Sequence, residues 1–170
     1  TESSSFNQTG NSLLITLFEH KQLRQGKIKA MKNLHQMNAS QAAQAIRKGE
    51  LKSEDLVQAC IERITDKEPQ THAWVSTNFS KALEQARHLD RSPYSGILHG
   101  IPFGAKDLFD THDFPTSYGS SIYQNNQPTS DAVHIALMRQ AGGILIGKTV
   151  TTEFATFKGG PTTNPQNRMH

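Results

Sequence analysis

Residues 96–107 read Gly-Ile-Leu-His-Gly-Ile-Pro-Phe-Gly-Ala-Lys-Asp, an apolar segment that is punctuated by glycines and ends in a lysine. The apolar run favours a buried strand over 98–103 that presents Lys106 just beyond its end. Lysine is rarely buried as a charged group, and an apolar pocket lowers its pKa until it can accept a proton near neutral pH. Lys106 is therefore either a buried lysine with a chemical role or an ordinary surface lysine beside Asp107.

A second apolar run, over 143–147, is typical of a fully buried strand. The helical pattern over 131–140 lies between the two strands. This alternation of strand, helix and strand predicts an α/β sheet with parallel neighbours. The residues expected on the inward face of that helix are Ala132, Val133, Ala136 and Leu137.

The chain before residue 96 favours helices that cover this sheet. Ser53 is a suitable N-cap for a helix that should end before Pro69, because proline disfavours a helical conformation in the preceding residue. Further elements are predicted by apolar spacing and by turn residues. They are helices over 40–47 and 79–89, a short strand over 72–75, a loop over 110–128 and a helical turn over 152–157.

The net charge of +3 over 170 residues has a local origin. The basic excess lies at Lys21, Arg24, Lys27, Lys29 and Lys32, without interleaved aromatics or a recognised nucleic-acid motif. We therefore expect residues 1–33 to be a polar, basic and disordered leader, residues 34–170 to form the folded part, and no nucleic-acid partner.

Cysteine usage and hydropathy bear on the cellular compartment. The chain has one cysteine, Cys60, so no disulfide can form within it. The apolar run over 12–18 is too short to span a membrane and lacks the flanks of a secretion signal. We expect a cytoplasmic protein with no membrane partner.

Two chemical signals are weak. Residues 142–149 fit the phosphate-binding pattern G-x-x-x-x-G-K-[ST], but the four middle residues read as a strand where a loop is required. None of the eight histidines is spaced as a zinc ligand, and no Gly-x-Ser-x-Gly motif occurs. We expect no cofactor and no metal.

Four motifs occur in one order along the chain. Lys-Asp at 106–107 is followed by Pro-Thr-Ser-Tyr-Gly-Ser at 115–120, by Ala-Gly-Gly-Ile-Leu-Ile-Gly-Lys-Thr-Val-Thr-Thr-Glu-Phe-Ala at 141–155 and by Thr-Asn-Pro at 163–165. This series resembles the first part of the amidase signature family, and the likeness extends over about 34–170. The run at 149–155 resembles general bacterial amidases more than the tRNA-dependent amidotransferases of the same family.

The resemblance implies the N-terminal portion of the amidase signature fold, a mixed sheet flanked by helices, and carboxamide hydrolysis by a Ser–cis-Ser–Lys triad. Lys106 matches the lysine of that triad. The two serines of the family belong to segments that follow the Asn-Pro motif, and the sequence ends at His170 before either of them. Ser117, Ser120 and Ser121 do not occupy those positions.

Three hypotheses follow. The chain contributes the lysine segment of an amidase that acts on a small carboxamide; it is a catalytically inactive fragment or interaction remnant; or it is the corresponding part of the amidase component of a tRNA-dependent amidotransferase. Since the serine segments are absent from these 170 residues, the fold itself is expected to be incomplete.

Overall fold

The computed structural model describes residues 33–156 and 158–166. The chain divides into two compact units, 1–34 and 35–170, and the description below concerns the second. Apart from Asn33, the leader predicted over 1–33 lies outside the described residues. The elements are η1 (Leu34–Gln36), α2 (Ala39–Arg47), α3 (Ser53–Thr71), β1 (Trp74–Thr77), α4 (Phe79–Leu89), β2 (Pro102–Lys106), η2 (Ser121–Tyr123), α5 (Val133–Gln140), β3 (Ile144–Thr149) and η3 (Glu153–Ala155).

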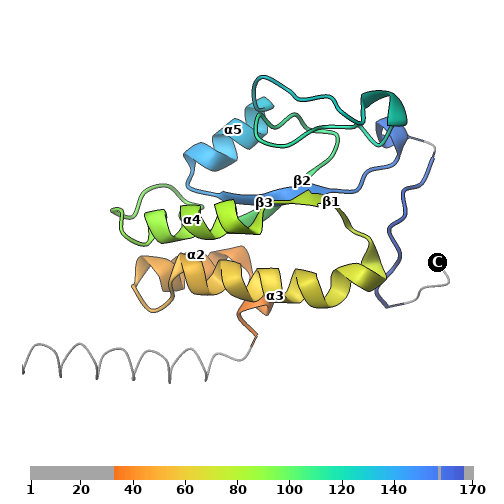
Figure 1. The fold of residues 1–170 in the computed structure, drawn as a ribbon. Coiled ribbons are helices and arrows are strands. Elements are labelled where there is room, and N and C mark those ends of the chain that lie inside the picture. The colour runs from red at the N-terminus through yellow and green to blue at the C-terminus, as the bar shows by residue number, and fades with distance from the viewer. Residues whose placement is uncertain (1–32, 157, 167–170) are drawn as a thin grey trace, which may run out of the picture. The chain divides into compact units, whose positions relative to one another are not determined.

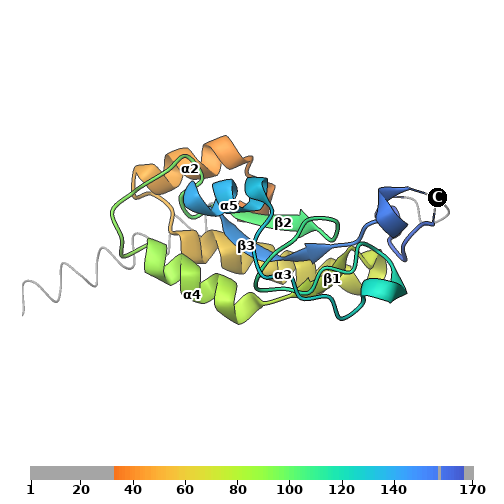
Figure 2. The same ribbon diagram turned by 90° about the horizontal axis from the view of Figure 1, so that it is seen from above.

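The described strands form a mixed sheet in the order β1-β3-β2. The central strand β3 runs parallel to β2 and antiparallel to β1. Helices α2, α3 and α4 lie on one side of the sheet, and α5 and the long loop after β2 lie on the other (Figure 1). The view from above shows the same layers stacked along the line of sight (Figure 2). The predicted mixed sheet with flanking helices is confirmed.

Two apolar clusters fill the space on either side of the sheet. Ile144 and Ile146 of β3 pack with buried residues of α3 and α4, among them Val57 and Ala82. Leu145, which points to the opposite face, packs with a second cluster that comprises Ala105, Phe114 and Ile135. The apolar faces predicted for the helices over 53–68 and 79–89 are therefore confirmed, and so is the buried strand at 143–147, which continues to Thr149.

The predicted position of the preceding strand is wrong. Residues 96–100 form turns, in which Gly96 and Gly100 both have φ of +77°, and β2 spans Pro102–Lys106. A side chain at position 100 would meet Ser53 Oγ at 1.9 Å, so the turn must pass α3 as a glycine. Lys106 is consequently the last residue of the strand, hydrogen-bonded within the sheet, rather than a residue beyond it.

Helix α3 begins and ends differently from the prediction. Its first turn is capped by a distant carboxylate: Asp90 accepts hydrogen bonds from the backbone N–H groups of Ser53 at 2.7 Å and Glu54 at 3.1 Å. Ser53 starts the helix instead of capping it, and its hydroxyl lacks a partner among the described residues. A cap that lies 37 positions away in sequence leaves no local signature.

Pro69 does not end α3, which continues to Thr71. The final turn is stabilised by Glu68, whose carboxylate accepts hydrogen bonds from the backbone N–H groups of Ala73 and Trp74. His72 then closes the helix in the left-handed conformation, with φ of 48°. These contacts compensate for the hydrogen bond that proline cannot donate.

The predicted inward face of α5 is also wrong. Ile135 is buried, whereas Val133 is 76% exposed and Leu137 is 57% exposed. Two ion pairs set the rotation of the helix: Arg139 Nη2 lies 2.6 Å from Asp113, and Arg139 Nε lies 2.9 Å from Asp131. These contacts direct Ile135 toward Leu145 and leave the neighbouring apolar positions at the surface.

The distant cap of α3 is testable by Asp90→Ala. Two backbone N–H groups would lose their acceptor, so the free energy of unfolding should fall by about 1 to 2 kcal/mol in urea denaturation. Asp66→Ala is the control, since that carboxylate lies at the surface with 59% of its side chain exposed. Equal stability of the two variants would contradict the capping role.

Candidate active site

A bulge in the sheet decides which way its lysines point. Phe103 pairs with Leu145 whereas Gly104 pairs with Gly147, so β3 contains one extra residue at this point. A bulge of this kind re-aims the side chains that follow it. Lys148 therefore pairs with Ala105 and points to the face of α5, although Ile144 and Ile146 point to the face of α3 and α4.

Lys148 is fully buried on that face. Its Nζ donates hydrogen bonds to the carbonyl oxygen of Phe109 at 2.8 Å and to the hydroxyl of Thr116, and lies 3.2 Å from Asp107 Oδ1. Desolvation lowers the pKa of Lys148, while the Asp107 carboxylate opposes that shift. Because these groups surround its Nζ, Lys148 ties the loop after β2 to the centre of the sheet.

Asp107 completes this polar cluster and is itself fully buried. Its second carboxylate oxygen accepts hydrogen bonds from the backbone N–H of Ser117 at 3.1 Å and from the Ser117 hydroxyl. Asp107 therefore fixes the start of the motif at 115–120, and its backbone N–H continues the β3 ladder by donating to Thr149 at 2.8 Å.

Lys106 occupies the opposite face of β2. Alternation along the strand places it on the same face as Gly104, where an added Cβ would meet the Trp74 ring at 2.8 Å. Its side chain is half-buried, and it has no side-chain hydrogen bond or ion pair within the part of the chain that the structure describes. Lys106 is paired with Thr149 at the carboxyl ends of two parallel strands, which is where open α/β sheets bind ligands.

A cavity of about 650 Å³ opens at this end of the sheet. It is lined by Trp74 and Ser76 of β1, by Asp107 and the segment around Ser117, and by Val150 and Thr151 after β3, so three loops meet around it. Among the described lining residues Asp107 alone carries a charge. Lys106 does not line the cavity but lies next to Asp107 in the chain, at the same edge.

The polar residues around α5 contain a group that the sequence did not reveal. His112, Asp113 and Asp131 bring one ligand atom each within 4.8 Å of one another. Both carboxylates already pair with cations: Arg139 contacts both, and Lys81 lies 3.0 Å from Asp113. The group therefore acts as an ion-pair network that orients α5.

The second histidine near the Lys106 segment, His99, is buried in a structural role. Its Nε2 lies 3.2 Å from the carbonyl oxygen of Leu89, and its Nδ1 lies 3.2 Å from the backbone N–H of Ser95. The imidazole thus connects the end of α4 to the turn before β2.

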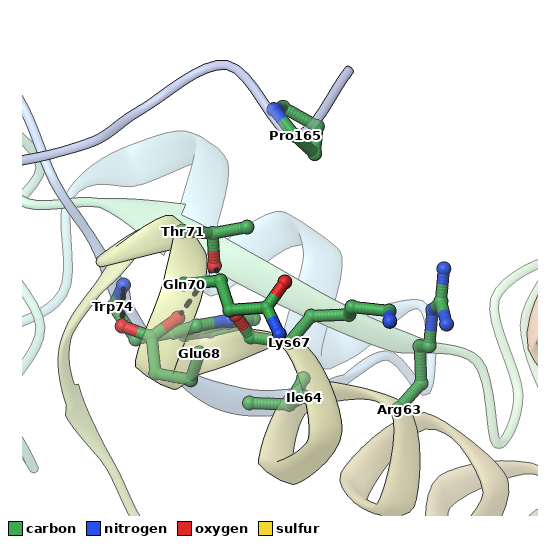
Figure 3. Close-up of a pocket in the computed structure, with 8 residues that line it drawn as sticks. All are labelled: Arg63, Ile64, Lys67, Glu68, Gln70, Thr71, Trp74 and Pro165. Atoms are coloured by element: carbon green, nitrogen blue, oxygen red, sulfur yellow. Dashed lines mark hydrogen bonds between the residues drawn. The ribbon is translucent and has the colours of Figure 1, made fainter. Parts of the chain in front are cut away.

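Another cavity, of about 360 Å³, lies at the end of α3. Figure 3 shows Pro165 across from Gln70 and Thr71, with Arg63 and Lys67 along the helix. Thr163 attaches this segment by hydrogen bonds to the carbonyl oxygens of Thr71 and Gln70. None of the three earlier motifs lines this cavity, so we assign it to the anchoring of the Thr-Asn-Pro motif.

Comparisons with known proteins identify the family. The model of the family described as Amidase matches residues 55–170. The chain belongs to the amidase signature family. It is 35% identical to the amidase component of the glutamyl-tRNA(Gln) amidotransferase of Oleidesulfovibrio alaskensis and to the putative amidase AmiD of Mycobacterium bovis, over 74% and 72% of its length. These two kinds of relative are equally similar to it.

Solved structures confirm the fold. The native peptide amidase from Stenotrophomonas maltophilia matches 75% of this chain with 32% identity and a TM-score of 0.67. This amidase chain spans only 26% of the two curated relatives and 27% of the peptide amidase. None of the described helices has the length and apolar character needed to cross a membrane.

The buried ion pair can be tested by Lys148→Met, measured by urea denaturation. Removal of the ammonium leaves Asp107 buried without its cation, so the free energy of unfolding should fall by about 3 to 5 kcal/mol. The double variant Asp107→Asn, Lys148→Met should be less unstable than the sum of its single variants. Additive losses would show that the two groups do not interact.

Proposed function

We propose that this chain supplies the lysine of an amidase that hydrolyses carboxamides by the Ser–cis-Ser–Lys mechanism. Lys106 is the general base in this proposal. The observation that carries it is the contrast between the two lysines at the carboxyl end of the sheet. Lys148 Nζ is surrounded by Asp107, Phe109 and Thr116, whereas Lys106 Nζ is not engaged by the described residues.

A general base must reach the proton that it accepts. Lys148 cannot do so without breaking the contacts that hold the loop after β2, even though its lowered pKa is of the kind that enzymes use. Lys106 stands at the end of its strand with a free, half-buried amine. A serine hydroxyl brought to that edge can transfer a proton to a neutral Lys106 and attack the carbonyl carbon of the amide.

The serines of the chain itself do not fit the role of nucleophile. The Ser117 hydroxyl donates to Asp107, and that carboxylate is paired with Lys148, which makes it a weak base. The Ser120 hydroxyl is enclosed. Both serines of the triad are therefore assigned to segments outside these 170 residues, in keeping with the family resemblance.

A second candidate is the amidase component of a glutamyl-tRNA amidotransferase, supported by the 35% identity to that kind of relative. The two candidates share the role of Lys106 and differ in the amide that is hydrolysed. A third, the inactive fragment, differs from both in predicting no hydrolysis when the serine segments are supplied.

The test is a chimera that joins this chain to the remaining length of an active amidase relative. Lys106→Ala should lower kcat/KM for a simple aryl amide about 10²- to 10⁴-fold. Lys106→Arg should be equally damaging, since arginine keeps its proton. The 170-residue chain alone should show no turnover.

Lys52→Ala is the matched control, because Lys52 is exposed and its side chain makes no capping hydrogen bond. It should retain the activity of the unsubstituted chimera. Hydrolysis that survives Lys106→Ala would overturn the assignment, and an inactive but folded chimera would favour the inactive fragment.

A further inference from the structure

The two loops that border the larger cavity also carry an exposed aromatic cluster. Tyr118 and Tyr123 contact each other edge to face, with ring centroids 5.2 Å apart, and Tyr123 contacts Phe154 in the same way at 6.1 Å. Tyr123 is 41% exposed and Phe154 is 47% exposed, next to Ile122 at 80%. We call Tyr118, Tyr123 and Phe154 the aromatic rim.

The backbone beneath the aromatic rim is strained. Tyr118, Phe154 and Ala155 have φ of 54°, 46° and 59°, in the left-handed region that bulky residues rarely adopt. The two loops are joined where the strain lies, since the backbone N–H of Phe154 donates to the carbonyl oxygen of Tyr118 at 2.8 Å. Strain of this kind is concentrated at ligand-binding sites.

The same loops form one side of the cavity. Gly119, Ser120 and Ser121 line it from the first loop, and Val150 and Thr151 line it from the second. Gly119 brings the loops together, because an added Cβ would lie 2.9 Å from the carbonyl oxygen of Thr152. The aromatic rim therefore flanks a cavity that lies at the Lys106 edge of the sheet.

The charges around the cavity are already paired. Asp107, the one charged residue among its described lining, is buried and bound to Lys148 and Ser117. A ligand that carries an ammonium group would find no free carboxylate in this lining, and its desolvation would go uncompensated. A neutral ligand with an apolar group meets no such cost and can bury that group against aromatic rings.

We propose that the cavity and its aromatic rim select uncharged carboxamides that bear an apolar or aromatic substituent, in preference to zwitterionic amides such as glutamine. The inference rests on the proposed amidase function and names its substrate class. It concerns binding, so it does not require that Lys106 act as the base.

The test uses the fluorescence of Trp74, which is the single tryptophan of the chain and lines the cavity. The 170-residue chain, with its folded state verified by circular dichroism, is titrated with 3-phenylpropanamide and separately with L-glutamine. We expect saturable quenching by the aryl amide and at least about tenfold weaker binding of glutamine.

Variants locate the site. Tyr123→Ala and Phe154→Ala should each weaken binding of 3-phenylpropanamide about tenfold. Val133→Ala, which truncates an exposed apolar side chain on α5, is the control and should leave binding unchanged. The inference is overturned if glutamine binds as tightly as the aryl amide, if both rim variants bind like the unsubstituted chain, or if the folded chain does not bind the aryl amide. Failure of the proposed function would show instead as hydrolysis that survives Lys106→Ala in the chimera.

Discussion

The buried ion pair between Lys148 and Asp107 is the interaction on which the rest of the site depends. Burying two charges is costly, and the cost is offset only where both groups are fully hydrogen-bonded. Here the lysine donates to Phe109 and Thr116, and the carboxylate accepts from Ser117. Each contact fixes one point of the loop after β2, so the pair determines how that loop crosses the carboxyl end of the sheet.

This arrangement separates two lysines that stand at the same end of the sheet. The bulge between Phe103 and Gly104 places Lys148 on the face of α5, and strand alternation leaves Lys106 on the other face. Burial and a lowered pKa identify functional lysines in many enzymes, yet in this molecule they identify the structural one. The chemically useful lysine is the one whose amine has no other task.

The sequence was informative wherever a feature depends on local spacing. The apolar faces of α3 and α4 and the central strand β3 were predictable, because their residues recur at the period of the element that they form. The motifs at 106–107 and 141–155 were sufficient to indicate the family, which the match over residues 55–170 confirms. Features that depend on distant residues could not be predicted. The cap of α3 comes from Asp90, and the buried position of Lys148 follows from one extra residue in β3, which leaves no mark in the sequence. The aromatic rim joins two loops that only the folded chain brings together.

The most direct test of the account is the pH dependence of kcat/KM for amide hydrolysis, measured in the chimera with each lysine replaced in turn. A general base that must be deprotonated produces a loss of rate on the acidic side of the profile. The account predicts that this acidic limb persists in Lys148→Met and disappears from the residual activity of Lys106→Ala. An acidic limb that persists in Lys106→Ala and disappears in Lys148→Met would contradict it and make Lys148 the base.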